Sequence, residues 1–123
     1  MFQNTGYAAA TRTTGVPRDI EYHAFSRVTG KLTRAVEDDL PFADLAAALH
    51  ENMTLWRAIA LDIADKSNGL TDQLRAQIFY LFEFTLAHTP KVLKGTADAK
   101  ALIEINTAIM NGLRPTALNR EAM

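Results

Sequence analysis

The residues that could do chemistry in this 123-residue chain are few and scattered. The absence of cysteine excludes disulfides, thiolate nucleophiles and sulfur-ligated metals. The histidines His23, His50 and His88 lack a second histidine at ligand spacing, and Thr54 stands where an HExxH zinc motif beginning at His50 needs its second histidine. We therefore expect no metal site and no cofactor.

Motifs for nucleophilic or acid–base catalysis are also missing. The serines, Ser26 and Ser67, lie outside any GxSxG motif, and the sequence has no glycine-rich phosphate loop. The pair Asp38-Asp39 precedes a predicted helix, where capping explains it better than catalysis does. The sequence thus predicts a protein that is not an enzyme.

Composition and charge narrow the class of partner. With 13 Lys+Arg against 14 Asp+Glu, the chain lacks the basic excess that nucleic-acid binding requires. An apolar fraction of 48% is ordinary for one globular domain. The segment 1–15 has no apolar run typical of a signal peptide, and the most apolar stretch, 76–87, is shorter than the ~20 residues that span a bilayer. We expect a cytoplasmic protein without a membrane span.

The first half of the chain predicts an arm and two helices. Residues 1–16 show no helical or strand periodicity, so we expect an irregular N-terminal arm. A helix over about 17–37 begins with Pro17, whose missing N–H costs nothing at a first helical position. A second apolar stripe at helical spacing covers about 41–65.

The second half predicts two more helices. Thr71 is the expected N-cap of a helix that is apolar on most sides, a pattern typical of a central helix, and Pro90 kinks or breaks it before Gly95 ends it. Thr96 or Asp98 caps the last helix. The predicted fold is an all-α, single-domain bundle of about four helices over 17–115, with a tail at 116–123.

Some polar residues fall on or beside the apolar stripes. Asn52, Asn106 and Asp62 either pair across helices, fixing the register of the bundle, or face a partner's backbone. Trp56 is predicted to be a core residue; the alternative is that it forms an interface hot spot with Arg57.

The first helix is a candidate recognition surface. It contains Gly30, which weakens it or admits a neighbouring backbone, and it brings Tyr22 and Phe25 close to the arm that carries Tyr7. Either this surface binds an amphipathic helix in a groove, or the helix simply completes a four-helix core.

Blocks of residues along nearly the whole chain resemble the FlaF family of alphaproteobacterial flagellar regulators. The specificity of this resemblance lies in the order of the blocks, because none is a catalytic fingerprint. They are Gly6-Tyr7; Pro17-Arg18, Glu21-Tyr22, Phe25 and Val28-Thr29; Leu49-His50-Glu51-Asn52 and Leu55-Trp56; Leu74-Arg75-Ala76-Gln77-Ile78, Phe84-Thr85 and His88; and Leu102-Ile103-Glu104-Ile105-Asn106 with Ile109-Met110.

The resemblance implies a small cytoplasmic all-α protein that supports flagellin synthesis and export, binds flagellin as a secretion chaperone does, and acts beside the regulator FlbT. A chaperone of this kind covers a filament subunit's amphipathic helices through apolar helix-in-groove contacts. The alternative is a regulator of flagellin mRNA, acting directly or through FlbT. We expect the protein-binding residues to be Tyr7, Arg18, Tyr22, Phe25, Val28, Leu32 and Arg57, with the two arginines at the rim.

Overall fold

The computed structural model describes residues 17–65 and 69–113, with the side chains of 22–65 and 69–112. This part of the chain forms an all-α bundle of four helices, as predicted. Their bounds are α2 Pro17–Glu37, α3 Phe42–Ala64, α4 Asp72–Leu93 and α5 Lys100–Leu113.

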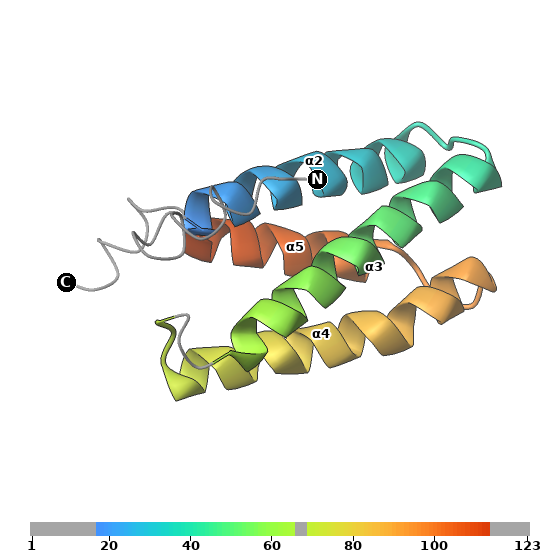
Figure 1. Ribbon diagram of the computed structural model, residues 1–123. Coiled ribbons are helices and arrows are strands. Elements are labelled where there is room, and N and C mark those ends of the chain that lie inside the picture. Colours follow the sequence, from blue (N-terminus) through green and yellow to red (C-terminus); the bar gives the residue numbers. More distant parts are fainter. Residues whose placement is uncertain (1–16, 66–68, 114–123) are drawn as a thin grey trace.

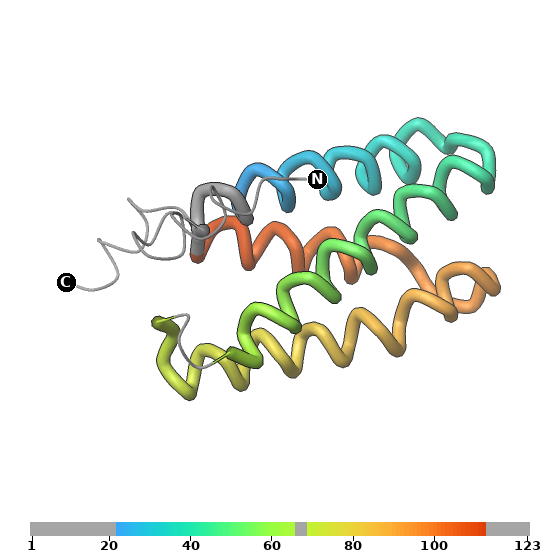
Figure 2. The backbone as a smooth tube through the Cα atoms, viewed as in Figure 1, coloured from blue at the N-terminus to red at the C-terminus, as the bar shows by residue number. Residues whose placement is uncertain are grey.

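Each helix runs antiparallel to the one before it, in an up-down-up-down order (Figures 1 and 2). α3 crosses obliquely, so its first turns lie against α2 and its last turns lie against α4. α2 packs closely on both α3 and α5, whereas α4 packs closely on α3 and only slightly on α5. α4 is therefore an edge helix, and the expectation that it is central was wrong: its apolar composition does not bring neighbours to all its sides.

The turn between α2 and α3 uses the aspartate pair differently from our prediction. Asp39 takes a left-handed conformation with φ 50°, and the Leu40 N–H donates to the Ala35 carbonyl at 3.0 Å, which closes α2 as a Schellman motif. The N-cap position of α3 is Pro41, which makes no side-chain capping bond. The pair Asp38-Asp39 thus ends α2 instead of capping α3, because an aspartate tolerates the left-handed conformation this exit needs.

The predicted signals at the ends of α4 are confirmed. The Thr71 hydroxyl accepts a hydrogen bond from the Leu74 N–H at 3.1 Å, so Thr71 is the N-cap. Gly95, with φ 79°, follows the helix in the left-handed conformation that favours glycine. Pro90 does not break the helix, and the Lys94 N–H donates to the Pro90 carbonyl at 3.0 Å.

The start of α5 selects one of the two predicted caps. The Asp98 carboxylate accepts from the Lys100 N–H at 2.8 Å, whereas the Thr96 hydroxyl donates back to the Lys91 carbonyl at 3.1 Å. Asp98 therefore caps α5, and Thr96 belongs to the exit from α4.

The core consists of two apolar clusters along the bundle. The first holds Leu32, Ala48, Leu49, Val92, Ala99 and Leu102. The second holds Phe25, Trp56, Ile59 and Ile63, flanked by half-buried side chains of α4 and α5. Both clusters include residues of α2 and α3, so this helix pair contributes to the whole length of the core.

Candidate functional site

Three of the residues predicted to line a groove on α2 fill the core instead. Phe25 and Val28 are each 1% exposed and Leu32 is fully buried. The Phe25 ring meets Trp56 edge-on, with their centroids 5.4 Å apart. Because α2 packs against both α3 and α5, its apolar stripe is already covered. This corrects the expected placement of Phe25, Val28 and Leu32 on an open surface.

Of the other predicted binding residues, the structure describes the side chains of Tyr22 and Arg57. Tyr22 is half-buried at the start of the described side chains, and Arg57 is exposed on α3. Arg18 lies on α2, but its side chain is outside the described residues, and so is all of Tyr7. Their roles in binding remain predictions.

The exposed apolar surface instead gathers on α4. Only Thr85, Thr89 and Val92 of this helix are buried. Its exposed apolar side chains include Phe79 (44%), Tyr80 (68%), Phe84 (37%) and Leu86 (43%). An apolar helix with essentially one close neighbour leaves such groups in water, and exposed apolar surface of this kind marks an interaction site.

The outward stripe of α4 combines this apolar surface with one acid. Ala76, Tyr80, Glu83 and Ala87 are spaced by four, three and four residues, so they lie on one face of the helix. All four are exposed. Glu83 forms no ion pair within the described part of the chain. The face therefore presents a single carboxylate among aromatic and small side chains.

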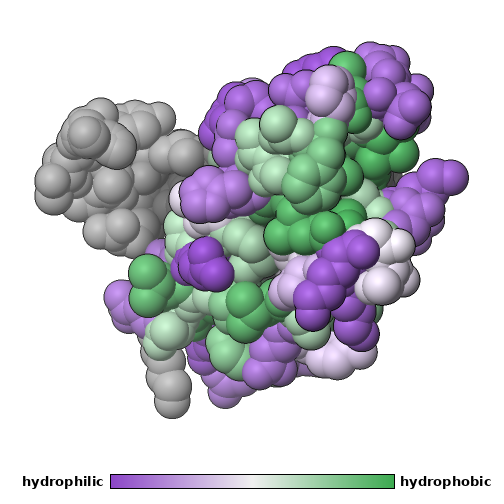
Figure 3. Space-filling view, turned by 90° about the vertical axis from the view of Figure 1, so that its right-hand side faces the viewer, coloured by the Kyte–Doolittle hydropathy of each residue, from purple (hydrophilic) through white to green (hydrophobic). Residues whose placement is uncertain are grey.

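Apolar exposure is not limited to α4. At the corner between α2 and α3, Leu40 is 38% exposed and Phe42 is 60% exposed. The end of the bundle that carries this corner and the α4–α5 connection shows green apolar surface between purple hydrophilic residues (Figure 3). These residues are few and lie at a turn, so α4 offers the longer apolar surface.

The signal for this surface is present in the sequence, because Phe, Tyr and Leu residues occur on most sides of α4. We interpreted this pattern as evidence that the helix is buried. Periodicity alone does not distinguish an apolar helix covered by several neighbours from one left open at an edge.

The interior holds a polar network between the helices. The Trp56 Nε1–H donates to Asn106 Oδ1 at 3.0 Å, and Asn106 Nδ2 donates to Asn52 Oδ1 at 2.8 Å. All three side chains are fully buried. This confirms that Trp56 is a core residue and that the two asparagines pair across α3 and α5. It leaves neither asparagine exposed to a partner.

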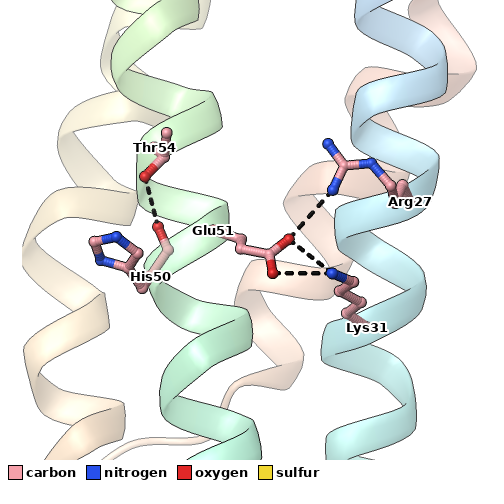
Figure 4. A network of polar contacts seen from close by, with 5 residues as sticks. All are labelled: Arg27, Lys31, His50, Glu51 and Thr54. Carbon is pink, nitrogen blue, oxygen red and sulfur yellow. Dashed lines mark hydrogen bonds and ion pairs between the residues drawn. The ribbon is translucent and has the colours of Figure 1, made fainter.

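A surface ion-pair cluster links α2 to α3 (Figure 4). Glu51 lies 2.9 Å from Lys31 Nζ and 3.2 Å from an Arg27 guanidinium nitrogen. The hydrogen bond from Lys31 lowers the pKa of the Glu51 carboxyl. Desolvation opposes this effect, and the charges of Lys31 and Arg27 add smaller lowering effects. His50, the residue before Glu51 on α3, points away from this cluster. These ion pairs hold α2 and α3 together, and His50 does not join Glu51 as a catalytic acid–base pair.

The histidines serve local contacts. His88 Nε2 donates to the Asp98 carbonyl at 2.8 Å, and its ring stacks on Phe84 with centroids 5.0 Å apart. His23 contacts the neighbouring Tyr22 ring. Within residues 17–65 and 69–113 no three His, Asp or Glu side chains are grouped as metal ligands. Over the same residues, no helix is long and apolar enough to cross a membrane.

Comparison with known proteins identifies a family. A family model described as flagellar protein FlaF matches residues 3–113. The searches of curated proteins and of solved structures gave no match. The matched range includes all four helices and the candidate surface on α4.

Proposed function

The chain belongs to the FlaF family of flagellar proteins, and we propose that it binds flagellin as a secretion chaperone and so supports flagellin synthesis and export. On this proposal the binding surface is the exposed apolar face of α4. The partner element is an amphipathic helix of flagellin, which lies along α4 with its apolar side inward. FlbT is a further proposed partner in the same process.

The observation that carries this proposal is the exposure of Phe79, Tyr80, Phe84 and Leu86 on a single helix. A filament subunit that polymerises through amphipathic helices needs those helices covered before export. A helix in water gains most by burying aromatic and leucine side chains, at about 25 cal/mol per Å² of apolar surface.

The test is a calorimetric titration of flagellin into the purified protein. We expect the double substitution Tyr80→Ala/Phe84→Ala to weaken flagellin binding by about tenfold or more, because it removes the two largest anchors from one side of the face. Leu61→Ala is the matched control, since Leu61 is 78% exposed on α3 and lies outside the proposed surface.

Equal flagellin affinities for the wild type and the α4 variant, with helical content unchanged by circular dichroism, would remove α4 from the site. Absence of flagellin binding, together with flagellin-mRNA binding that weakens steeply with salt, would favour the alternative of an mRNA regulator. Phe25 is not a suitable probe, because truncating a buried ring destabilises the fold.

A further inference from the structure

We infer that, in the absence of another partner, the outer face of α4 is covered by a second copy of this chain, with the two α4 helices antiparallel and centred on Ala87. The pairing itself rests on the geometry and charge of α4. It touches the proposed function only in that flagellin would have to displace the second copy.

The exposed area is sufficient for a specific dimer. At about 200 Å² for a full aromatic or leucine side chain, the exposed fractions of Phe79, Tyr80, Phe84 and Leu86 leave roughly 400 Å² of apolar surface per copy. A standard interface buries about 800 Å² per partner, of which a little over half is apolar. These four side chains approach the apolar area required, with Phe84 and Leu86 facing the partner's α4 and with Phe79 and Tyr80 at its end.

The small residue at the centre of the proposed pairing suits a symmetric helix pair. Ala87 is exposed and lies on the same face as Tyr80. A twofold axis at Ala87 lets the two backbones approach at that point, and it sets each Tyr80 level with the partner's Lys94, where the partner's α4 ends. The same patch thus serves both copies.

Charge complementarity selects a second copy with this orientation. Glu83 lies four residues before Ala87 and Lys91 lies four residues after it. An antiparallel copy therefore brings each Glu83 level with the Lys91 of its partner, within reach of that long side chain. Neither Glu83 nor Lys91 forms an ion pair within the described residues. A parallel copy would instead set like charges beside each other.

Sedimentation velocity of the full chain over a range of concentrations tests the pairing. We expect a reversible monomer–dimer equilibrium. Glu83→Lys and Lys91→Glu should each weaken dimerisation by about tenfold, because symmetry turns two favourable pairs into two repulsive ones. Glu104→Lys makes the same charge change on the exposed surface of α5 and should leave the equilibrium unchanged.

Rescue by charge exchange identifies the geometry. The double variant Glu83→Lys/Lys91→Glu should dimerise like the wild type, and an equimolar mixture of the two single variants should form heterodimers in which both pairs are restored. Failure of both rescues would overturn the antiparallel arrangement. A protein that stays monomeric at millimolar concentration would overturn the pairing altogether.

The two proposals fail separately. A protein that stays monomeric but binds flagellin through Tyr80 and Phe84 would contradict only the proposed dimer. A rescued dimer that flagellin neither binds nor dissociates would support the pairing and contradict the proposed function.

Discussion

At the scale of single residues, the buried polar network constrains how α3 and α5 pack. Asn106 accepts from Trp56 and donates to Asn52, so it satisfies two groups that water cannot reach. Buried polar groups cost little while they are paired and much more when one partner is removed. The network therefore favours one register of α5 against α3.

We expect Asn106→Ala to lower the free energy of unfolding by about 2–4 kcal/mol, because it leaves the Trp56 N–H and the Asn52 carbonyl unpaired. Urea denaturation of both proteins measures the change. Asn111→Ala, at an exposed position on the same helix, is the matched control and should have little effect. Equal losses for the two variants would show that the network does not stabilise the fold.

The Glu51 cluster predicts a small dependence of stability on pH. Its carboxyl has a pKa lowered from an ordinary value of 4.5 in the folded protein, first by the hydrogen bond from Lys31. Its contribution is therefore complete above about pH 4.5 and is lost as the pH falls through the lower folded-state pKa. Since the Glu51 side chain is 36% exposed, we expect the contribution to be only about 0.2–1 kcal/mol.

Glu51→Gln should remove this part of the pH dependence, measured as unfolding free energy between pH 3 and pH 6, about one and a half units either side of the ordinary carboxyl range. Glu104→Gln is the control on α5. If the Glu51 variant keeps the acid-dependent loss of the wild type, the cluster has no energetic role.

At the scale of the helices, Gly30 and Gly95 have opposite roles. A Cβ built at Gly30 in α2 would meet only the Arg34 guanidinium, at 3.5 Å, an ordinary contact with a flexible side chain. Of the two predicted alternatives for Gly30, this excludes the close approach of a neighbouring backbone and leaves the weakening of the helix. Gly95, by contrast, needs its left-handed conformation to end α4.

Gly30→Ala should raise the free energy of unfolding by about 0.5–1 kcal/mol, through higher helix propensity and a less flexible unfolded chain. Gly95→Ala should lower it by about 1 kcal/mol, because alanine is strained at φ 79°. Thermal denaturation separates the two cases. Effects of the same sign, or a loss of stability for Gly30→Ala with a gain for Gly95→Ala, would contradict the assignment of their roles.

At the scale of the whole molecule, the helices differ in how firmly they are held. α3 contributes seven buried side chains, among them Trp56, Ile59 and Ile63. α4 contributes three, two of which are threonines. A helix with few buried apolar contacts unfolds locally at a lower free-energy cost than the better-buried helices it packs against.

Amide hydrogen exchange should therefore show weaker protection along α4 than along α3, at equal intrinsic rates and at a protein concentration low enough to keep the chain monomeric. Raising the concentration should increase protection in α4 first if a second copy covers it. Uniform protection across the bundle at low concentration would contradict this difference.

The helices and several of their ends could be predicted from the sequence, because they depend on interactions between residues close together in the chain. Pro17 begins a helix, Thr71 caps one and Gly95 ends one, for reasons that act within a few residues. The family was likewise predictable, because the resemblance depends on which residue blocks occur along the chain and in what order.

Which apolar face remains exposed depends on how the helices pack together, and residue spacing does not give this. Residue spacing shows that α2 and α4 each have an apolar side, but not how many neighbours lie against it. α2 packs closely on two helices, and its Phe25, Val28 and Leu32 are buried, whereas α4 packs closely on one and leaves Tyr80 and Phe84 exposed. Burial is a property of the assembled helices, which is why the predicted surface on α2 became core and the predicted centre became the edge.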